Sequence, residues 1–223
     1  MTAQLFSQAI VKYLGGLLIV GLLLFLPAGT LAYGQAWLLI AILFIPMFIA
    51  GLIMLKKSPE LLRKRLDARE EQSEQKTVVI LSGMMFSAAF IVAGLNFRFS
   101  WIVLPAWVSY VSAAVFLLAF ALYAEVLREN AWLSRTVEVQ ENQKVVDTGL
   151  YGVVRHPMYL STLLLFLSMP LVLGSVPSFV IMLAYIPIIA KRIRNEEKVL
   201  ESELEGYAEY KKRVRYKVVP FVW

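Results

Sequence analysis

The sequence "RHPMY", residues 155–159, contains the only histidine of the chain, His156, next to Arg155. Pro157 suits the first turn of a helix, so we expect His156 at the opening of the apolar helix that follows. A helix start offers free backbone N–H groups and a partial positive charge, to which Arg155 would add. This pattern favours an anion-binding pocket, with a plain interfacial anchor as the alternative.

A second charged group, "KRIRNEEKV", lies where the last apolar segment ends. Glu196 and Glu197 fall within one helical turn of both Ile193 and Leu200, so both carboxylates border the apolar face that should pack inward. Arg192 is one turn before Glu196 and can reach the same side. Ionisable groups that interrupt an inward face usually mark function, whereas the alternative is a solvated charge run.

The link before the histidine also carries polar and aromatic groups. Residues 136–139 ("TVEV") alternate like a short strand, and "DTG" at 147–149 is typical of a turn, so we expect an ordered link. Tyr151 and Tyr159 offer aromatic faces for stacking or for a cationic centre. Further polar contacts could come from Gln140, Gln143 and Lys144, for which simple surface exposure is the alternative.

The numbers of cysteine and histidine residues exclude several classes of chemistry. The chain has no cysteine, which removes disulfides, thiolate metal sites and a cysteine nucleophile. With one histidine besides, we expect no metal site. The net charge of +6 comes from basic residues beside apolar segments, so we expect contact with anionic lipid headgroups rather than with nucleic acid.

The elements that would position these residues are membrane helices. The 223 residues are 59% hydrophobic and 17% charged, with a mean hydropathy of +0.68. Apolar runs long enough to cross a bilayer as helix predict an all-α integral membrane protein with five to six transmembrane helices. The apolar segments are 9–28, 36–55, 77–97, 102–127, 159–174 and 177–190. The last two are short and meet at "LGSVPS", which predicts a tight helical hairpin, and a helical extension follows.

Charge divides the links into two sets. The links after 28, after 97 and at the hairpin tip carry little or no charge, whereas those at 56–76, 128–158 and after Lys191 are long and basic. The positive-inside rule therefore places the basic links and both chain ends in the cytoplasm. The membrane would be the inner or plasma membrane of a prokaryote, or the endoplasmic reticulum of a eukaryote.

The first basic link and the domain limits complete the predicted organisation. In "SPELLRKRL", Ser58 can cap a helix with Pro59 at its first position, which predicts an interfacial helix or, alternatively, a lid over a site. We expect four transmembrane helices in residues 1–127, with a cytoplasmic link at 56–76. Residues 128–223 would then form the catalytic region, made of the ordered link, the hairpin and the C-terminal helix.

The C-terminal two fifths of the chain resembles a known family. "DTGLYGVVRHPMYLST", an apolar hairpin, "RNEEKVLESELEGYAEYKKRV" and a closing "PF" in this order resemble the isoprenylcysteine carboxyl methyltransferases, with the phospholipid methyltransferases as wider kin. The resemblance implies an S-adenosylmethionine-dependent methyltransferase built from membrane helices. The chain has no G-x-G-x-x-G after a strand, which agrees with the absence of a soluble dinucleotide-binding domain.

The resemblance also implies roles for individual residues. Cofactor contacts would fall on Gln140, Gln143, Lys144, Val145, Val146, Tyr151, His156, Pro157, Met158, Tyr159 and Glu196, and the helix-start argument adds Arg155. Arg192 takes the position linked in the family to substrate handling and catalysis, and we expect Glu196 and Glu197 to act with it. The loop before "DTG" is shorter than in eukaryotic members, and Ser161 replaces a family glycine.

The predicted reaction is methyl transfer to a lipophilic or prenylated substrate, with membrane lipids as the surroundings. A carboxylate acceptor is favoured because it is already ionised at neutral pH and needs no general base. An amine acceptor would have to lose a proton, to Glu196 or Glu197. Three alternatives remain: an N-methyltransferase of phospholipids or other amines, an NADPH-dependent enzyme similar to the membrane sterol reductases, and a non-catalytic membrane binding protein.

Overall fold

The computed structural model describes residues 2–66, 73–130, 132–133 and 139–223. Within these residues all regular structure is helical, and five helices are long and apolar enough to cross a membrane. The predicted all-α integral membrane fold is therefore confirmed. The "TVEV" strand prediction falls largely outside the described residues.

The helices follow the predicted apolar segments closely. The first four long ones are α1 (Thr2–Ala28), α2 (Gly34–Lys57), α4 (Ser73–Phe99) and α5 (Ala106–Glu129). Between α2 and α4 lies α3 (Pro59–Leu66), which begins at the predicted proline. The fourth apolar segment was expected from residue 102, but α5 begins at Ala106 because Pro105, directly before it, has an extended backbone with ψ of 141°.

The C-terminal half contains the predicted hairpin. A 3-10 turn, η1 (Gly149–Gly152), precedes α6 (Pro157–Val172), α7 (Val176–Met182), α8 (Tyr185–Glu203) and α9 (Tyr207–Arg213). The chain reverses at Gly174, whose φ of +70° suits glycine, and the Ser175 side chain caps α7 by accepting from the Ser178 N–H. Pro187 has no N–H to donate to Leu183, which explains the break between α7 and α8 within one apolar stretch, Val176–Glu203.

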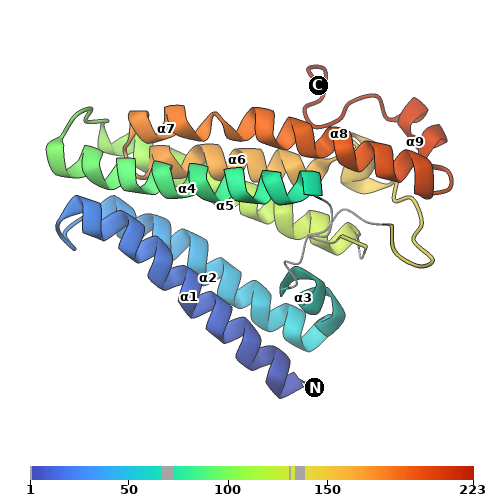
Figure 1. Cartoon of the computed structure of the whole chain (residues 1–223), viewed down its shortest axis with the longest axis horizontal. Helices are drawn as coiled ribbons and strands as arrows, with labels where there is room; N and C mark the ends of the chain where they lie inside the picture. The colour runs from blue at the N-terminus through green and yellow to red at the C-terminus, as the bar shows by residue number, and fades with distance from the viewer. Residues whose placement is uncertain (1, 67–72, 131, 134–138) are drawn as a thin grey trace.

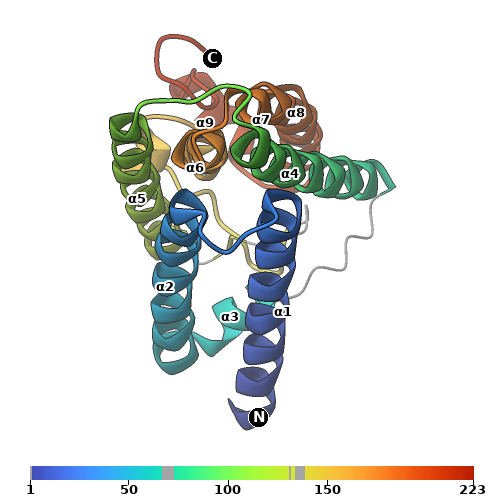
Figure 2. The same cartoon turned by 90° about the vertical axis from the view of Figure 1, so that its left-hand side faces the viewer.

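The helices form a bundle and a pair. Figures 1 and 2 show α4 to α8 packed along one another, with α1 and α2 beside them as a pair that diverges from the bundle toward the N-terminus. Where α1 meets α4, the two backbones approach closely: a Cβ added at Gly94 would lie 2.6 Å from the Leu24 carbonyl oxygen. Buried Phe90 and Phe116 belong to the core between the pair and the bundle.

The two ends of the molecule differ in charge. The weakly charged turns after α1, α4 and α6 lie at one end, while both chain ends, α3 and α9 lie at the other (Figure 1). The described parts of all three basic links therefore lie at one end, called here the polar end. At the opposite end the Tyr33 hydroxyl donates to the Leu173 carbonyl at 2.7 Å, which joins the first turn to the hairpin tip.

The length of α6 decides where a site can form. With 16 residues, α6 is about 24 Å long, shorter than the roughly 30 Å hydrocarbon core of a bilayer. Its neighbours α5 and α8 are longer, with 24 and 19 residues. The start of α6 therefore lies short of the polar end, and the ends of α5 and α8 enclose a space in front of it.

Candidate functional site

A cavity opens at the polar end in front of α6, and it is called here the polar cavity. Its empty space, including the part open to solvent, is about 840 Å³. Four parts of the chain line it: the segment directly after α5, the link before α6, the start of α6, and α8 with α9. The start of the fifth apolar segment and the polar extension of the sixth, far apart in sequence, thus meet at one cavity.

The C-terminal segment, residues 214–223, fixes the start of α6. The backbone N–H of Arg155 donates to the Tyr216 carbonyl at 3.0 Å, and that of His156 donates to the Lys217 carbonyl at 2.8 Å. These two N–H groups precede the helix and would otherwise need partners in a buried setting. The segment therefore anchors the "RHPMY" motif against α8 and α9.

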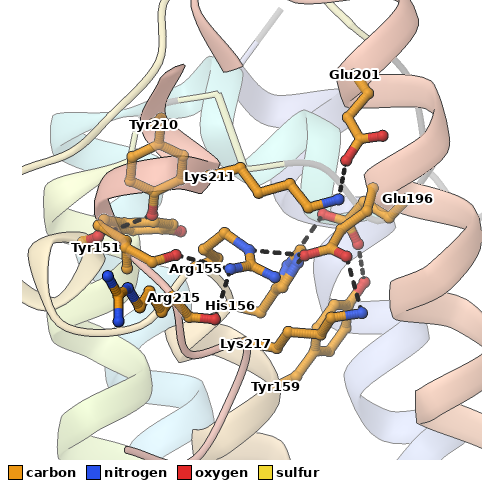
Figure 3. Close-up of polar contacts among 12 residues, drawn as sticks. Tyr151, Arg155, His156, Tyr159, Glu196, Glu201, Tyr210, Lys211, Arg215 and Lys217 are labelled. Atoms are coloured by element: carbon orange, nitrogen blue, oxygen red, sulfur yellow. Dashed lines mark hydrogen bonds and ion pairs between the residues drawn. The ribbon is translucent and has the colours of Figure 1, made fainter. Parts of the chain in front are cut away.

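Glu197 is the centre of a buried ionic network. Figure 3 shows its partners Arg155, His156 and Lys217 gathered at one place. Its carboxylate accepts from Arg155 Nε at 2.8 Å, lies 3.3 Å from His156 Nε2 and pairs with Lys217 Nζ at 3.0 Å. Arg155 also donates to the carbonyls of Val214 and Arg215 at 2.7 and 2.8 Å. The side chains of Arg155 and Glu197 are 4% and 6% exposed, so water screens this network little. It joins α6, α8 and the C-terminal segment.

Glu196 occupies a different position from its neighbour. It lines the polar cavity and accepts a hydrogen bond from the Tyr159 hydroxyl, and the same hydroxyl accepts from Arg192 Nε at 3.1 Å. His156 Nδ1 lies 4.0 Å from the Glu196 carboxylate. Arg192, Tyr159 and Glu196 therefore form one connected polar group on the wall where α6 meets α8.

Three tyrosines form another part of the wall. Tyr151 accepts from Asn130 at its hydroxyl, with 3.0 Å between the atoms, and its carbonyl accepts from the Tyr210 hydroxyl at 2.8 Å. The Tyr207 hydroxyl is buried and has no hydrogen-bond partner within the described part of the chain. Burial, followed by the charges of Glu197 and Glu196, raises the pKa of Tyr207 well above its usual value, so the hydroxyl remains a donor.

The link before α6 supplies the remaining wall. Gln143, Lys144, Val145 and Val146 all line the polar cavity. The link is held by its own contacts: the Gln140 N–H donates to the Gln143 side chain at 2.8 Å, and the Gln140 amide donates to the Trp132 carbonyl at 2.6 Å. The predicted turn at "DTG" is present, since Gly149 has a φ of +54° and η1 begins there.

Most of the predicted site residues meet at this cavity. Those that line it are Gln143, Lys144, Val145, Val146, Tyr151, Arg155, His156, Met158, Tyr159, Arg192 and Glu196. Three do not line it: Gln140 supports the link, Pro157 is buried at the first turn of α6, and Glu197 lies in the ionic network behind the wall. Their predicted roles remain predictions.

Other lining residues were not predicted. They are Asn130, Trp132, Leu133, Val199, Leu200, Leu204, Tyr207 and Tyr210. Leu200, Leu204 and Tyr207 are spaced four and three residues apart, and this helical spacing is a usable signal of an inward face in the sequence. Nothing in the sequence pointed to Asn130 and Trp132, because only the fold brings the end of α5 to α8. Among the described residues no group of three or more His, Asp or Glu side chains could hold a metal ion.

Comparisons with known proteins match part of the chain to a methyltransferase family and part to a sterol reductase. Residues 107–205, a little under half of the chain, match a family described as phospholipid methyltransferase. The match runs from the start of α5 to just past α8 and so includes "RHPMY" and Glu196. A 91-residue stretch is also 29% identical to a Delta(14)-sterol reductase of Mus musculus, covering 40% of this chain and 22% of the reductase. The chain thus spans less than a quarter of that relative's length.

Proposed function

We propose that this protein is a membrane methyltransferase that uses S-adenosylmethionine and acts on a lipophilic acceptor. The observation that carries the proposal is the meeting of residues 155–159 with Arg192 and Glu196 at one cavity, inside the segment that matches a methyltransferase family. The narrower assignment, an O-methyltransferase similar to the isoprenylcysteine carboxyl methyltransferases, rests on the sequence resemblance.

The polar cavity fits the proposed cofactor in chemistry. The unpartnered Tyr207 hydroxyl offers a buried donor for a ribose or adenine acceptor atom. Glu196 offers a carboxylate to an ammonium or ribose hydroxyl, and the ring of Tyr151 offers an aromatic face. Glu197 supports this arrangement from behind, since it positions Arg155 and His156 rather than lining the cavity.

For a carboxylate acceptor the residues would supply alignment rather than proton transfer. When bound, S-adenosylmethionine would supply an electrophilic methyl group to an acceptor oxygen, with its sulfur as the leaving group. A carboxylate acceptor needs no base, so Arg192 would bind and orient it, held in place by Tyr159. For an amine acceptor Glu196 would be the base, because Glu197 lies behind the wall.

The test is titration of purified protein with S-adenosylhomocysteine. We expect Glu196→Ala and His156→Ala to weaken binding at least tenfold, about 1.4 kcal/mol, because each removes a polar group of the cavity wall. Arg192→Ala should bind with little change in affinity but lose turnover by orders of magnitude. Unchanged affinity in both cavity variants would refute the assignment of the pocket, and normal turnover would remove Arg192 from the mechanism.

The similarity to a sterol reductase supports a second candidate. Such an enzyme would bind NADPH in the same cavity and reduce a lipophilic substrate. NADPH would need contacts for a second ribose and an extra phosphate, and Arg155, the arginine nearest the start of α6, is already bound to Glu197 and two carbonyls. Thermal-shift screening with S-adenosylmethionine and with NADPH separates the two, since only the true cofactor should raise the melting temperature.

A further inference from the structure

His156 is the only histidine of the chain, and a carboxylate lies near each nitrogen of its ring. Nε2 is 3.3 Å from the Glu197 carboxylate, and Nδ1 is 4.0 Å from the Glu196 carboxylate. The first distance allows a hydrogen bond, whereas the second is too long for one. The ring therefore has one side that is bound by the ionic network and one side toward Glu196, which lines the polar cavity.

The contact with Glu197 determines which ring nitrogen carries a proton. Glu197 also accepts from Arg155 Nε at 2.8 Å and pairs with Lys217 Nζ at 3.0 Å, and a carboxylate between two cations stays ionised. An ionised carboxylate has no hydrogen to donate, so the hydrogen between it and His156 belongs to Nε2. The charge of the ring then depends on whether Nδ1 binds a second proton.

The charges around the ring favour its neutral form. The contacts around His156 join three cations, Arg155, Arg192 and Lys217, to the two carboxylates. Lys144 of the link also lines the cavity, and the tyrosines of the wall are uncharged at neutral pH. The described part of the wall thus already has an excess of positive charge. A second proton on the ring would add to this excess where water screens charge little, so Nδ1 stays bare.

Lys217 is the cation of this group that comes from the C-terminal segment. It lies outside residues 107–205, which match the methyltransferase family. Its ammonium group pairs with Oε2 of Glu197, whereas Arg155 and His156 both contact Oε1. Without Lys217, three cations and two carboxylates would become two of each, and a second proton on His156 would restore the earlier balance.

We propose that Lys217 is a positioning residue for His156: it keeps the ring neutral, with its proton on Nε2 and a bare Nδ1 toward the polar cavity. A bare Nδ1 can accept a hydrogen bond from a ligand, and a neutral ring does not repel the positive sulfonium of S-adenosylmethionine. The consequence for the cofactor rests on the proposed function, whereas the state of the ring does not.

Nitrogen NMR of the single histidine tests the state of the ring directly. The protein is produced with ¹⁵N-labelled histidine, purified with a tag that contains no histidine and kept in detergent at neutral pH, so every ring signal belongs to His156. The chemical shifts of the two nitrogens distinguish both neutral tautomers from the doubly protonated ring. We expect a proton on Nε2 alone. A proton on Nδ1 alone, or on both nitrogens, would overturn the proposal.

Three lysine variants test whether Lys217 sets this state. Lys217→Met removes the charge but keeps a long side chain, so we expect most rings to bind the second proton at the same pH. Lys217→Arg retains the charge and should give the wild-type signals. Lys212→Met removes an exposed lysine of α9 and should also give them.

Other results in Lys217→Met would contradict the proposal. An unchanged ring would show that the lysine does not control its charge. A mixture of the two neutral tautomers would show that Lys217 only holds the C-terminal segment in place. The same change in Lys212→Met would show a general effect of lost positive charge.

Titration with two ligands tests the consequence for the cofactor. S-adenosylmethionine carries a positive sulfonium, whereas S-adenosylhomocysteine does not. We expect the affinity of Lys217→Met for the first to fall about fivefold more than its affinity for the second, because the charged ring repels the sulfonium. Equal losses would overturn this effect of ring charge. If the wild type shows the expected ring but binds neither ligand, the methyltransferase proposal fails while the role of Lys217 stands.

Discussion

At the scale of single residues, adjacent glutamates have unlike surroundings. Glu196 and Glu197 are neighbours in sequence, yet Glu196 lines the polar cavity and Glu197 is buried inside the ionic network. Successive helix residues point about 100° apart, so one carboxylate reaches the cavity while the next reaches the C-terminal segment. The pair therefore divides into one group that can contact a ligand and one that holds the wall.

Removal of Glu197 should destabilise the protein. Glu197→Ala leaves Arg155 buried without its carboxylate, and breaking a buried ion pair on one side costs about 3–5 kcal/mol. We expect a clear fall in the melting temperature in detergent. The control is Glu201→Ala one turn along α8, whose carboxylate pairs with Lys211 at the surface, because exposed pairs contribute about 0–1 kcal/mol. Equal effects of the two variants would contradict the network.

Two tyrosine variants should have opposite signatures. Tyr207→Phe removes an unpartnered buried hydroxyl, so the ligand-free protein should keep or slightly raise its melting temperature while affinity for S-adenosylhomocysteine falls about fivefold. Tyr210→Phe removes the bond to the Tyr151 carbonyl and should lower the melting temperature. Thermal unfolding and calorimetric titration of both proteins check this. Unchanged affinity in Tyr207→Phe would show that its hydroxyl does not contact the ligand.

At the scale of elements, the short helix α6 and the close contact of α1 with α4 shape the molecule. The length of α6 follows from the polar motif that precedes Pro157, since residues 155 and 156 bind the C-terminal segment instead of extending the helix. The α1–α4 contact depends on Gly94, which has no side chain to separate the backbones. Small residues commonly permit such approach between membrane helices.

A methyl group at Gly94 should disturb that contact. In Gly94→Ala the new Cβ would lie 2.6 Å from the Leu24 carbonyl oxygen, and α1 would have to move. We expect a loss of about 1–3 kcal/mol, as for overpacked interiors. Gly83→Ala on the same helix meets nothing within 4 Å and should be neutral or slightly stabilising through helix propensity. The melting temperatures of the two variants, measured in the same detergent, test whether Gly94 is needed for the contact between α1 and α4.

At the scale of the whole molecule, the basic links gather at one end. The structure brings α3, α9 and both chain ends together, and the positive-inside rule predicts that this end faces the cytoplasm (Figure 1). The polar cavity is at the same end. We therefore propose that the cofactor enters from the cytoplasm, while an acceptor enters from the bilayer.

Single cysteines test this orientation directly, because the chain has none of its own. Ser58→Cys and Ser202→Cys should react with a membrane-impermeant maleimide only from the cytoplasmic side. Ser100→Cys, in the turn after α4, should react only from the opposite side. Labelling of intact cells and of inverted vesicles, quantified by gel shift, gives the result. Reaction of all three from one side would refute the predicted topology.

The sequence alone determined the helices and the chemistry available. Hydropathy located the membrane segments, because apolar runs of bilayer length have few other stable states, and Pro59, Pro157 and Gly174 marked starts and turns. Helical spacing also showed that Glu196 and Glu197 border an inward face. These signals are local in the sequence and do not depend on which helices pack against one another.

Only the tertiary structure decided which groups share a cavity. The separation of Glu196 from Glu197, the arrival of Asn130 and Trp132, and the buried Tyr207 hydroxyl depend on contacts between residues far apart in sequence. A second cavity likewise requires α1, α2 and α3 to meet at one place. Helical periodicity determines on which face of its helix a residue lies. It does not determine which other helix packs against that face, because packing depends on the shapes of all neighbouring helices together.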